Sequence, residues 1–243
     1  MSELSNYIDE YLKTEYTLKS TLKDSVQSSV YLYQKNDSAK QIVKISQKNR
    51  NDHVLRRLRG QLNKNTATIY EVCSNDEDVT VLEEYISGAT LRHIVEANGG
   101  TLKRELAVKY ALDICNGLVF IHSLGIIHRD IKPSNIIITE QGEAVIIDFG
   151  IARLTDDSTY ADTKNLGTAG YAAPEQFGIY QSGPVTDIYA VGVLLNELLL
   201  GVHPTIDTPK GKLGKVINKC IMAQMSKRYQ NVSELAEVLN KLL

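Results

Sequence analysis

The sequence has few cysteines and no excess of basic residues. Its 243 residues contain only three cysteines, Cys73, Cys115 and Cys220, which lie far apart and lack the spacing of metal ligands. We therefore expect reduced, mostly buried thiols rather than a disulfide framework or a metal site. The formal net charge of -2 shows no basic excess, so a nucleic-acid or polyanion partner is not expected.

A long apolar run is also missing. The longest candidate, residues 188–202, is interrupted by Asn196 and Glu197 and indicates a buried core helix rather than a membrane span. Residues 1–16 are polar and charged, unlike a signal peptide. These absences predict a soluble, cytoplasmic protein.

Strand-forming residues dominate the first third of the chain. Residues 29–34, 41–46, 67–72 and 79–86 are rich in the valine, isoleucine, tyrosine and threonine that favour strands. One short helix is expected at residues 52–60, between the second and third of these strands.

After Gly88 the pattern changes to helices. Apolar residues at helical spacing over residues 106–121 predict one long amphipathic helix. A second, more uniformly apolar helix is expected at residues 185–200, and a last one begins near Ser233. A small β-rich region followed by a larger helical region is an α+β fold.

Two short motifs carry the residue types that phosphoryl transfer requires. The reaction needs a group that accepts the proton of the attacking hydroxyl, and metal ions that neutralise charge on the phosphates. A carboxylate at Asp130 can accept the proton, and Lys132 can place a positive charge near the phosphate. The oxygens of Asn135 and Asp148 are hard ligands suited to Mg²⁺. A hairpin between them, over residues 136–147, would bring these two ligands together.

These residues stand in the stretch HRDIKPSN at residues 128–135 and in the triplet DFG at residues 148–150. Both resemble, residue by residue, the motifs of eukaryotic-type serine/threonine protein kinases, and the resemblance extends over residues 16–243. It implies a bilobal fold with a β-rich N-lobe at residues 16–86, a helical C-lobe at residues 88–243 and an N-terminal extension at residues 1–15. It also implies ATP and Mg²⁺ or Mn²⁺ as cofactors and protein substrates as partners, and it sets no oligomeric state.

The resemblance assigns roles to individual residues of the helical region. It makes Asp130 the catalytic base, Lys132 the phosphate-contacting lysine, and Asn135 and Asp148 the metal ligands. Residues 167–175 resemble the end of an activation segment. Within this resemblance Glu175 and Arg228 form a buried ion pair, and Asp187 braces the catalytic loop.

Specificity and control are implied by three kinds of residue. Lys132 and Thr168 resemble the pair that favours serine and threonine hydroxyls, with Thr168 bonded to the base and the lysine. Arg129 before the base suggests control by phosphorylation, because a phosphate on the activation segment can pair with it. We expect autophosphorylation at Thr159 or Thr163, against the alternative of a solvated loop without such a role.

The nucleotide side departs from the family pattern. The glycine positions of the phosphate-covering loop hold Lys23, Ser25 and Ser28, which predicts a looser fit to phosphates. Ile42 replaces the usual alanine that packs on adenine. The resemblance gives this ATP-binding set: Val30, Ile42, Lys44, Glu83, Glu84, Ile86 and Ile137.

The acidic partner of Lys44 is the least regular part of this set. The helical glutamate of the family is replaced by Asn51, and its neighbour Asp52 is an alternative. Glu83 stands just before the hinge residues, where a buried carboxylate is costly unless it is paired. We therefore expect a contact between Lys44 and Glu83.

Three functions are compatible with the sequence. An active protein kinase needs five residues that are all present, which favours that function: Lys44, Asp130, Lys132, Asn135 and Asp148. The altered nucleotide side is the feature that favours a pseudokinase or nucleotide-binding scaffold. A small-molecule kinase has no need of residues 167–175.

A further departure from the family pattern is at residues 205–214, which are expected to form a loop where the family often has a helix that docks substrates.

Overall fold

The structure is a computed structural model that describes residues 3–26, 28–48, 52–75, 78–156, 168–177 and 181–243. The chain divides into two units, residues 1–63 with 67–86, and residues 64–66 with 87–243. The division after residue 86 falls where the sequence changes from strand to helix patterns. The α+β fold class is confirmed, with a β-sheet unit followed by a helical one.

Unit 1 is built on an antiparallel five-stranded sheet in the order β1-β2-β3-β5-β4. Its elements are α1 (Glu3–Glu15), β1 (Tyr16–Asp24), β2 (Ser28–Lys35), β3 (Gln41–Lys48), α2 (Asp52–Leu58), β4 (Ile69–Ser74) and β5 (Asp78–Glu84). The four strands and the short helix that the sequence predicts are all present. The sequence did not predict α1 or β1.

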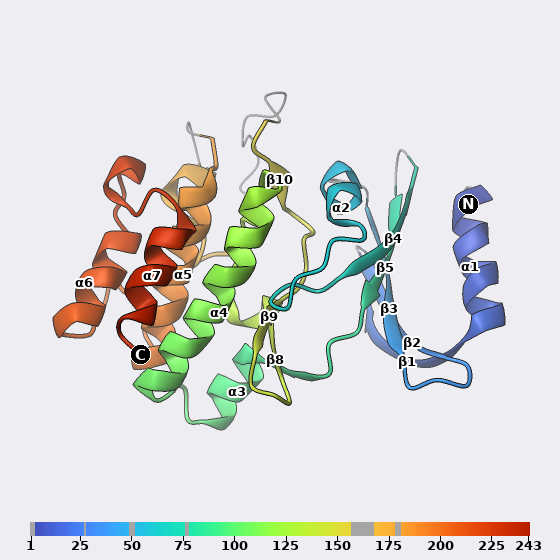
Figure 1. Cartoon of the computed structure of the whole chain (residues 1–243), viewed down its shortest axis with the longest axis horizontal. Coiled ribbons are helices and arrows are strands. Elements are labelled where there is room, and N and C mark those ends of the chain that lie inside the picture. The colour runs from blue at the N-terminus through green and yellow to red at the C-terminus, as the bar shows by residue number, and fades with distance from the viewer. Residues whose placement is uncertain (1–2, 27, 49–51, 76–77, 157–167, 178–180) are drawn as a thin grey trace. The chain divides into compact units, whose positions relative to one another are not determined.

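Helix α1 packs on one face of this sheet. Its residues Ile8 and Leu12, one helical turn apart, are 1% and 2% exposed and cluster with Ile42 and Leu82 of the sheet. Helix α2 lies on the other side of the sheet (Figure 1), where it contacts β4, and its residue Val54 is buried. The sheet therefore has an α1 face and an α2 face, each covered in part by one helix.

The direction of each strand side chain follows from the register. Residues directly opposite in an antiparallel pair point to the same face, and neighbours along a strand point to opposite faces. The α1 face holds Tyr31, Lys44 and Leu82, which are paired across three strands. The α2 face includes the opposite pairs Val30–Ile45 and Val43–Glu83, together with Val81, the partner of Ile45.

Unit 2 is mainly helical. Its helices and strands are β6 (Gly88–Thr90), α3 (Leu91–Ala97), α4 (Arg104–Ser123), β7 (Ile126–Ile127), β8 (Ile136–Thr139), β9 (Ala144–Ile146), β10 (Arg153–Leu154), α5 (Pro184–Leu200), α6 (Gly211–Cys220) and α7 (Val232–Asn240), with short 3-10 helices at Pro133–Asn135, Pro174–Phe177 and Met225–Lys227. The three helices expected from the sequence are α4, α5 and α7, and the expected hairpin is β8–β9.

A short segment of the linker, residues 64–66, belongs to unit 2. The amide of Ile146 donates to the Asn65 carbonyl oxygen at 2.9 Å, and the Asn65 side chain donates to the Ala144 carbonyl oxygen at 2.9 Å. Gly117 of α4 faces this segment, where an added Cβ would lie 2.7 Å from the Asn65 carbonyl oxygen. This close approach holds the β8–β9 hairpin against α4.

One helix boundary differs from the prediction. Residues 205–214 were expected to be a loop, but α6 already begins at Gly211. Two glycines favour a loop in the sequence, but both have a place in the helix. Gly211 takes a φ of +82° where the helix starts, and Gly214 lies close to the Pro209 carbonyl oxygen, where a side chain would not fit. None of the helices in the described ranges is long and apolar enough to span a membrane.

Candidate functional site

The loop between β7 and β8 is held from below by Asp187 of α5. One carboxylate oxygen accepts the His128 amide at 2.9 Å, and the other accepts the Arg129 amide at 2.8 Å. The His122 ring nitrogen lies 2.7 Å from the same carboxylate. Burial opposes ionisation of Asp187, but the hydrogen bonds from His122 and the Arg129 amide lower its pKa below the usual value. The bracing contact implied by the family resemblance is present.

Arg129, which precedes Asp130 in this loop, has an unusual backbone conformation. Its φ of +67° lies in the left-handed region, which is costly for a residue other than glycine. The strained conformation is held at both ends, because the Gln176 side chain donates to the Arg129 carbonyl oxygen at 2.9 Å and Arg129 Nε donates to the Ile151 carbonyl oxygen at 2.8 Å. No local sequence pattern predicts this contact of Gln176.

Asp130 is the centre of a hydrogen-bond network. Lys132 Nζ lies 2.6 Å from Asp130 Oδ2, and the Thr168 hydroxyl donates to Oδ1 at 2.8 Å. Lys132 also donates to the Thr168 hydroxyl at 2.7 Å, so the three side chains form a closed ring. The Asn135 amide nitrogen adds a bond to Asp130 Oδ2 at 2.9 Å. Both carboxylate oxygens are thereby fixed in direction.

Asn135 and Asp148 come together at the open end of the β8–β9 hairpin. The Ile147 amide donates to the Asn135 carbonyl oxygen at 3.0 Å, one residue before Asp148. The Asn135 side-chain nitrogen is used on Asp130, which leaves its oxygen as the atom for a metal ion. Asp148 is exposed, has a φ of +66° and accepts the Gly150 amide at 3.0 Å.

This oxygen pair suits a hard divalent cation. Within the described ranges, no group of three or more histidine, cysteine, aspartate or glutamate side chains is placed to hold a metal. An ion bound by Asn135 and Asp148 would take its remaining ligands from water and phosphate oxygens. Mg²⁺ is normally held in this way, by one or two carboxylates with substrate phosphates.

Two buried rings join the two motifs. The His128 and Phe149 rings lie 5.2 Å apart, and the two residues are 0% and 2% exposed. Burial lowers the pKa of His128, and it outweighs the attraction of the nearby carboxylates of Asp187, Asp148 and Asp130. The imidazole is therefore neutral in the folded protein.

A neutral buried histidine makes stability depend on pH. The unfolded histidine binds a proton below about pH 6.5, while the folded one does not, so the unfolded state gains protons first. We expect the contribution of neutral His128 to the free energy of unfolding to be constant above that pH. Below it, the free energy of unfolding should fall by up to about 1.4 kcal/mol per pH unit. Denaturant titrations at pH 7.5, 6.5 and 5.5 measure this slope.

His128→Tyr, which keeps an aromatic ring without the titration, should flatten this slope. His93→Gln changes an exposed histidine of α3 and should leave the slope as it is. An equal slope in His128→Tyr and in the unchanged chain would contradict the assignment.

A buried ion pair anchors the segment around Glu175. Arg228 Nη1 and Nη2 donate to the two Glu175 carboxylate oxygens at 2.6 and 2.8 Å, and the two side chains are 0% and 2% exposed. The Thr186 hydroxyl donates to Glu175 at 2.9 Å. The Tyr171 hydroxyl donates to the Glu197 carboxylate of α5. The ion pair implied by the resemblance is present and ties Glu175 to Arg228, while the bonds with Thr186 and Glu197 fix the segment to α5.

The resemblance assigns Arg129, Thr159, Thr163 and Thr168 to regulation. Thr168 is described and contacts Asp130 and Lys132, as stated above. Thr159 and Thr163 lie outside the described residues. Arg129 is 8% exposed, and its Nε already donates to the backbone at Ile151. Its pairing with a phosphate stays a prediction.

The nucleotide-side residues of unit 1 fall on both faces of the sheet. Val30 and Glu83 point to the α2 face, while Ile42 and Lys44 point to the α1 face. Lys44 Nζ lies 2.5 Å from the carboxylate of Asp9 in α1. The expected Lys44–Glu83 contact is therefore wrong, because Glu83 is a residue of the opposite face.

The alternative partner of Lys44 is also wrong. Asp52 accepts hydrogen bonds from Ser74 at 2.8 Å and from Arg56 at 3.3 Å. Burial acts against its ionisation, but these bonds lower the pKa of Asp52. Asn51 lies outside the described residues. Asp9 lies within residues 1–15, for which the resemblance implies only an N-terminal extension.

The turn that replaces the glycine loop bonds to itself. The Ser25 hydroxyl donates to the Ser28 carbonyl oxygen at 2.9 Å, and the Ser28 amide donates back to that hydroxyl at 3.2 Å. The Ser25 amide also donates to the Ser28 carbonyl oxygen, at 3.0 Å. Groups that could bind phosphates are therefore used within the turn.

The resemblance assigns three more residues to ATP binding: Glu84 at the end of β5, Ile86 two residues beyond it, and Ile137 within β8. The Glu84 amide donates to the Thr68 carbonyl oxygen at 2.9 Å, and the Thr68 amide donates to the Glu84 carboxylate at 3.2 Å. Ile86 ends unit 1 and is half-buried. Ile137 of β8, in unit 2, is also half-buried.

Comparison with known proteins gives consistent matches. A family model described as "Protein kinase domain" matches residues 14–243. A protein of Clostridium acetobutylicum named as a probable serine/threonine-protein kinase is 34% identical over 207 residues, covering 74% of this chain and 31% of that protein. A protein of the same description from Clostridium perfringens is 32% identical over 223 residues, covering 79% of this chain and 32% of that protein. A serine/threonine-protein kinase of Mycobacterium leprae is 41% identical over 132 residues, covering 53% of this chain and 21% of that protein. The chain thus spans about a third or less of the length of these relatives.

Proposed function

The chain belongs to the protein kinase family, and from that premise we propose that it transfers the γ-phosphoryl group of ATP to serine and threonine hydroxyls of protein substrates. The observation that carries the proposal is the closed ring of Asp130, Lys132 and Thr168. Asp130 has a carboxyl group whose two oxygens are both oriented, with Lys132 Nζ 2.6 Å from one of them. No such ring is needed by a protein that only binds nucleotide.

The proposed mechanism assigns one task to each residue. Asp130 accepts the proton of the substrate hydroxyl and orients its oxygen toward the phosphorus. Lys132 places its ammonium beside the transferred group and stabilises the negative charge there. Thr168 holds both side chains and leaves a shallow site, which suits an aliphatic hydroxyl.

Asn135 and Asp148 would hold the divalent ion, Mg²⁺ or Mn²⁺, which neutralises charge on the phosphates when it is bound. Asn135 also fixes Asp130 through its amide nitrogen. A single side chain thus couples the position of the base to the metal site. ATP and reduced thiols are features of the cytoplasm, where we propose that the chain acts, since all three cysteines are free and buried.

The nucleotide is proposed to be held weakly. The Ser25–Ser28 turn uses its own amides and hydroxyl, and Lys44 is paired with Asp9 rather than with an acidic residue of α2. These are the features that favour the alternative, a nucleotide-binding scaffold. They weaken binding of the nucleotide without removing any group of the transfer site.

The test is an incubation of the purified chain with labelled ATP, Mg²⁺ or Mn²⁺ and a generic protein substrate, followed by phosphoamino-acid analysis. The proposal expects label on serine and threonine. Label confined to bound nucleotide would support the scaffold, and label on tyrosine would contradict the assigned specificity.

A further inference from the structure

The register of the sheet in unit 1 separates residues that are expected to bind one nucleotide. Val43, not Ile42, is the direct partner of Glu83, and Ile45, not Lys44, is the partner of Val30. A change of one residue in register moves every side chain of a strand to the other face. Lys44 therefore cannot share a face with Val30 and Glu83.

The α1 face is already occupied around Lys44. Ile42, two residues away on the same face, is 1% exposed under Ile8 and Leu12 of α1. The Lys44 ammonium is held by Asp9, and the Lys44 side chain is 13% exposed. A cavity of about 270 Å³ remains between α1 and this face, but its lining of Ile8, Tyr11, Tyr16, Ile42, Tyr70 and Leu82, with Lys40 and Glu71, is mostly apolar and aromatic. Such a lining is poorly suited to a triphosphate.

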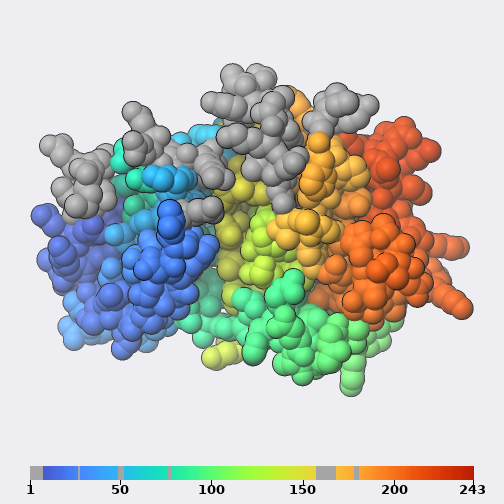
Figure 2. Space-filling model, turned by 180° about the vertical axis from the view of Figure 1, so that it is seen from behind, coloured from blue at the N-terminus to red at the C-terminus, as the bar shows by residue number. Residues whose placement is uncertain are grey.

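The α2 face offers a different lysine. Lys23 of β1 is directly opposite Val30 and so points to the same face as Val30 and Val43. The other strand lysines with a register partner, Lys35, Lys44 and Lys48, alternate onto the α1 face. Lys23 is exposed, and within the described residues no acidic side chain pairs with it. The blue residues of β1 lie on the outside of unit 1 (Figure 2).

We propose that Lys23, rather than Lys44, supplies the positive charge that binds the nucleotide phosphates, and that Lys44 anchors α1 to the sheet through Asp9. Lys23 stands next to the Ser25–Ser28 turn, at a position where the family has a glycine of its phosphate-covering loop. A lysine ammonium binds phosphate as a point charge and needs no fixed geometry, so an exposed and flexible side chain can serve. The inference rests on the proposed function in that the chain must bind ATP.

The test makes two measurements on each variant: the affinity for ADP with Mg²⁺ by calorimetry, and the melting temperature by thermal unfolding. Lys23→Ala should weaken ADP by about tenfold or more and leave the melting temperature unchanged. Lys19→Ala removes another exposed β1 lysine and controls for the loss of net charge. It should change neither quantity.

Lys44→Ala and Asp9→Ala should each lower the melting temperature, and the double variant should lose less than the sum of the two. ADP affinity should persist in both single variants at temperatures where they are folded. Lys44→Met, which keeps the apolar stem, provides a folded variant if Lys44→Ala does not fold.

Loss of ADP binding in a folded Lys44 variant, or unchanged ADP binding in Lys23→Ala, would overturn the inference. Failure of the proposed function has a different signature, because binding is measured without transfer. A chain that binds ADP through Lys23 but never labels a substrate would refute transfer alone. A chain that does not bind ADP at all would refute both.

Discussion

Replacing Asp130 by asparagine is expected to lower the rate of phosphoryl transfer by about 10²–10⁴-fold, the usual contribution of a positioned general base. Asparagine has nearly the same volume, and its one amide oxygen can still accept the hydrogen bond from Lys132 while its amide nitrogen faces Thr168, but it cannot take the substrate proton. ADP affinity should stay unchanged, because the removed group acts on the hydroxyl and not on the nucleotide. Initial rates with labelled ATP at saturating concentration measure the effect.

The matched control is Asp78→Asn. Asp78 of β5 is an exposed aspartate that pairs with Lys48 at 3.0 Å in unit 1. Its replacement makes the same chemical change away from the catalytic loop and should leave the rate as it is. Transfer by Asp130→Asn at a rate close to that of Asp78→Asn would exclude Asp130 as the base.

Replacing Arg228 by alanine is expected to destabilise unit 2 by about 3–5 kcal/mol, because Glu175 would keep a buried charge without its partner. Three more bonds would be lost with the guanidinium, to the carbonyl oxygens of Met222 at 2.7 Å, Val185 at 3.0 Å and Ala223 at 3.3 Å. Urea unfolding followed by circular dichroism measures the change. The double variant Glu175→Gln/Arg228→Met, which removes both charges, should lose less than Arg228→Ala.

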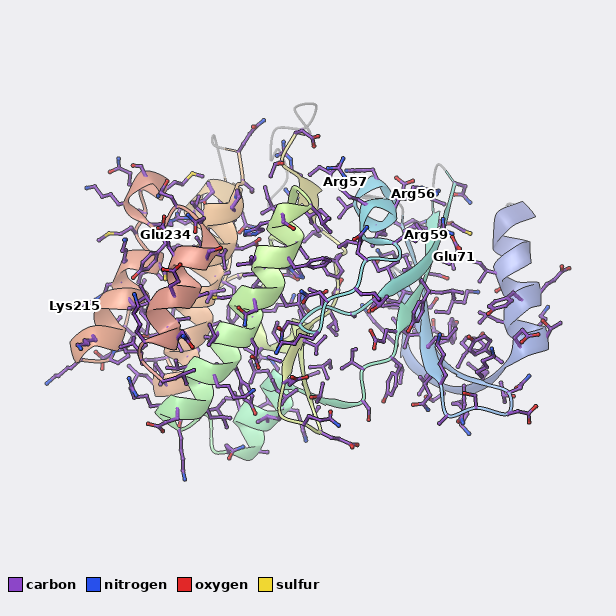
Figure 3. The ribbon with its side chains drawn as sticks, viewed as in Figure 1. Arg56, Arg57, Arg59, Glu71, Lys215 and Glu234 are labelled. Atoms are coloured by element: carbon purple, nitrogen blue, oxygen red, sulfur yellow. The ribbon has the colours of Figure 1, made fainter. Side chains whose placement is uncertain are left out.

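An ion pair of the same residue types in unit 1 is the control. Arg59 and Glu71 lie 2.8 Å apart, and their side chains are 51% and 34% exposed (Figure 3). Water screens such a pair, so Arg59→Ala should cost no more than about 1 kcal/mol. Equal losses in Arg59→Ala and Arg228→Ala would show that burial does not determine the strength of the Glu175 pair.

The helical unit could be predicted well because its site residues are close in sequence or sit in strongly patterned elements. Asp130, Lys132 and Asn135 share one loop, and a hairpin of short strands returns the chain to Asp148. Helical periodicity predicted α4 and α7, and a more uniformly apolar run predicted α5. Gln176 could not be predicted, since its contact with Arg129 depends on the fold of the segment between them.

The sheet unit was less predictable for a physical reason. Strand composition locates a strand, but only its pairing decides which side chains share a face. Ile42 and Lys44 were expected beside Val30 and Glu83, and the register places them on the opposite face. Helix α1 was not expected because residues 1–15 are largely polar, and its apolar contacts with the sheet come from few positions such as Ile8 and Leu12.

Titration of ATP in the transfer assay tests the central claim most directly. The claim is that the transfer site of unit 2 is complete while unit 1 binds the nucleotide weakly. It predicts transfer that depends on Asp130 and reaches saturation only near or above about 1 mM ATP, at the upper end of ordinary KM values. Saturation at low micromolar ATP, or no transfer at any ATP concentration, would contradict it.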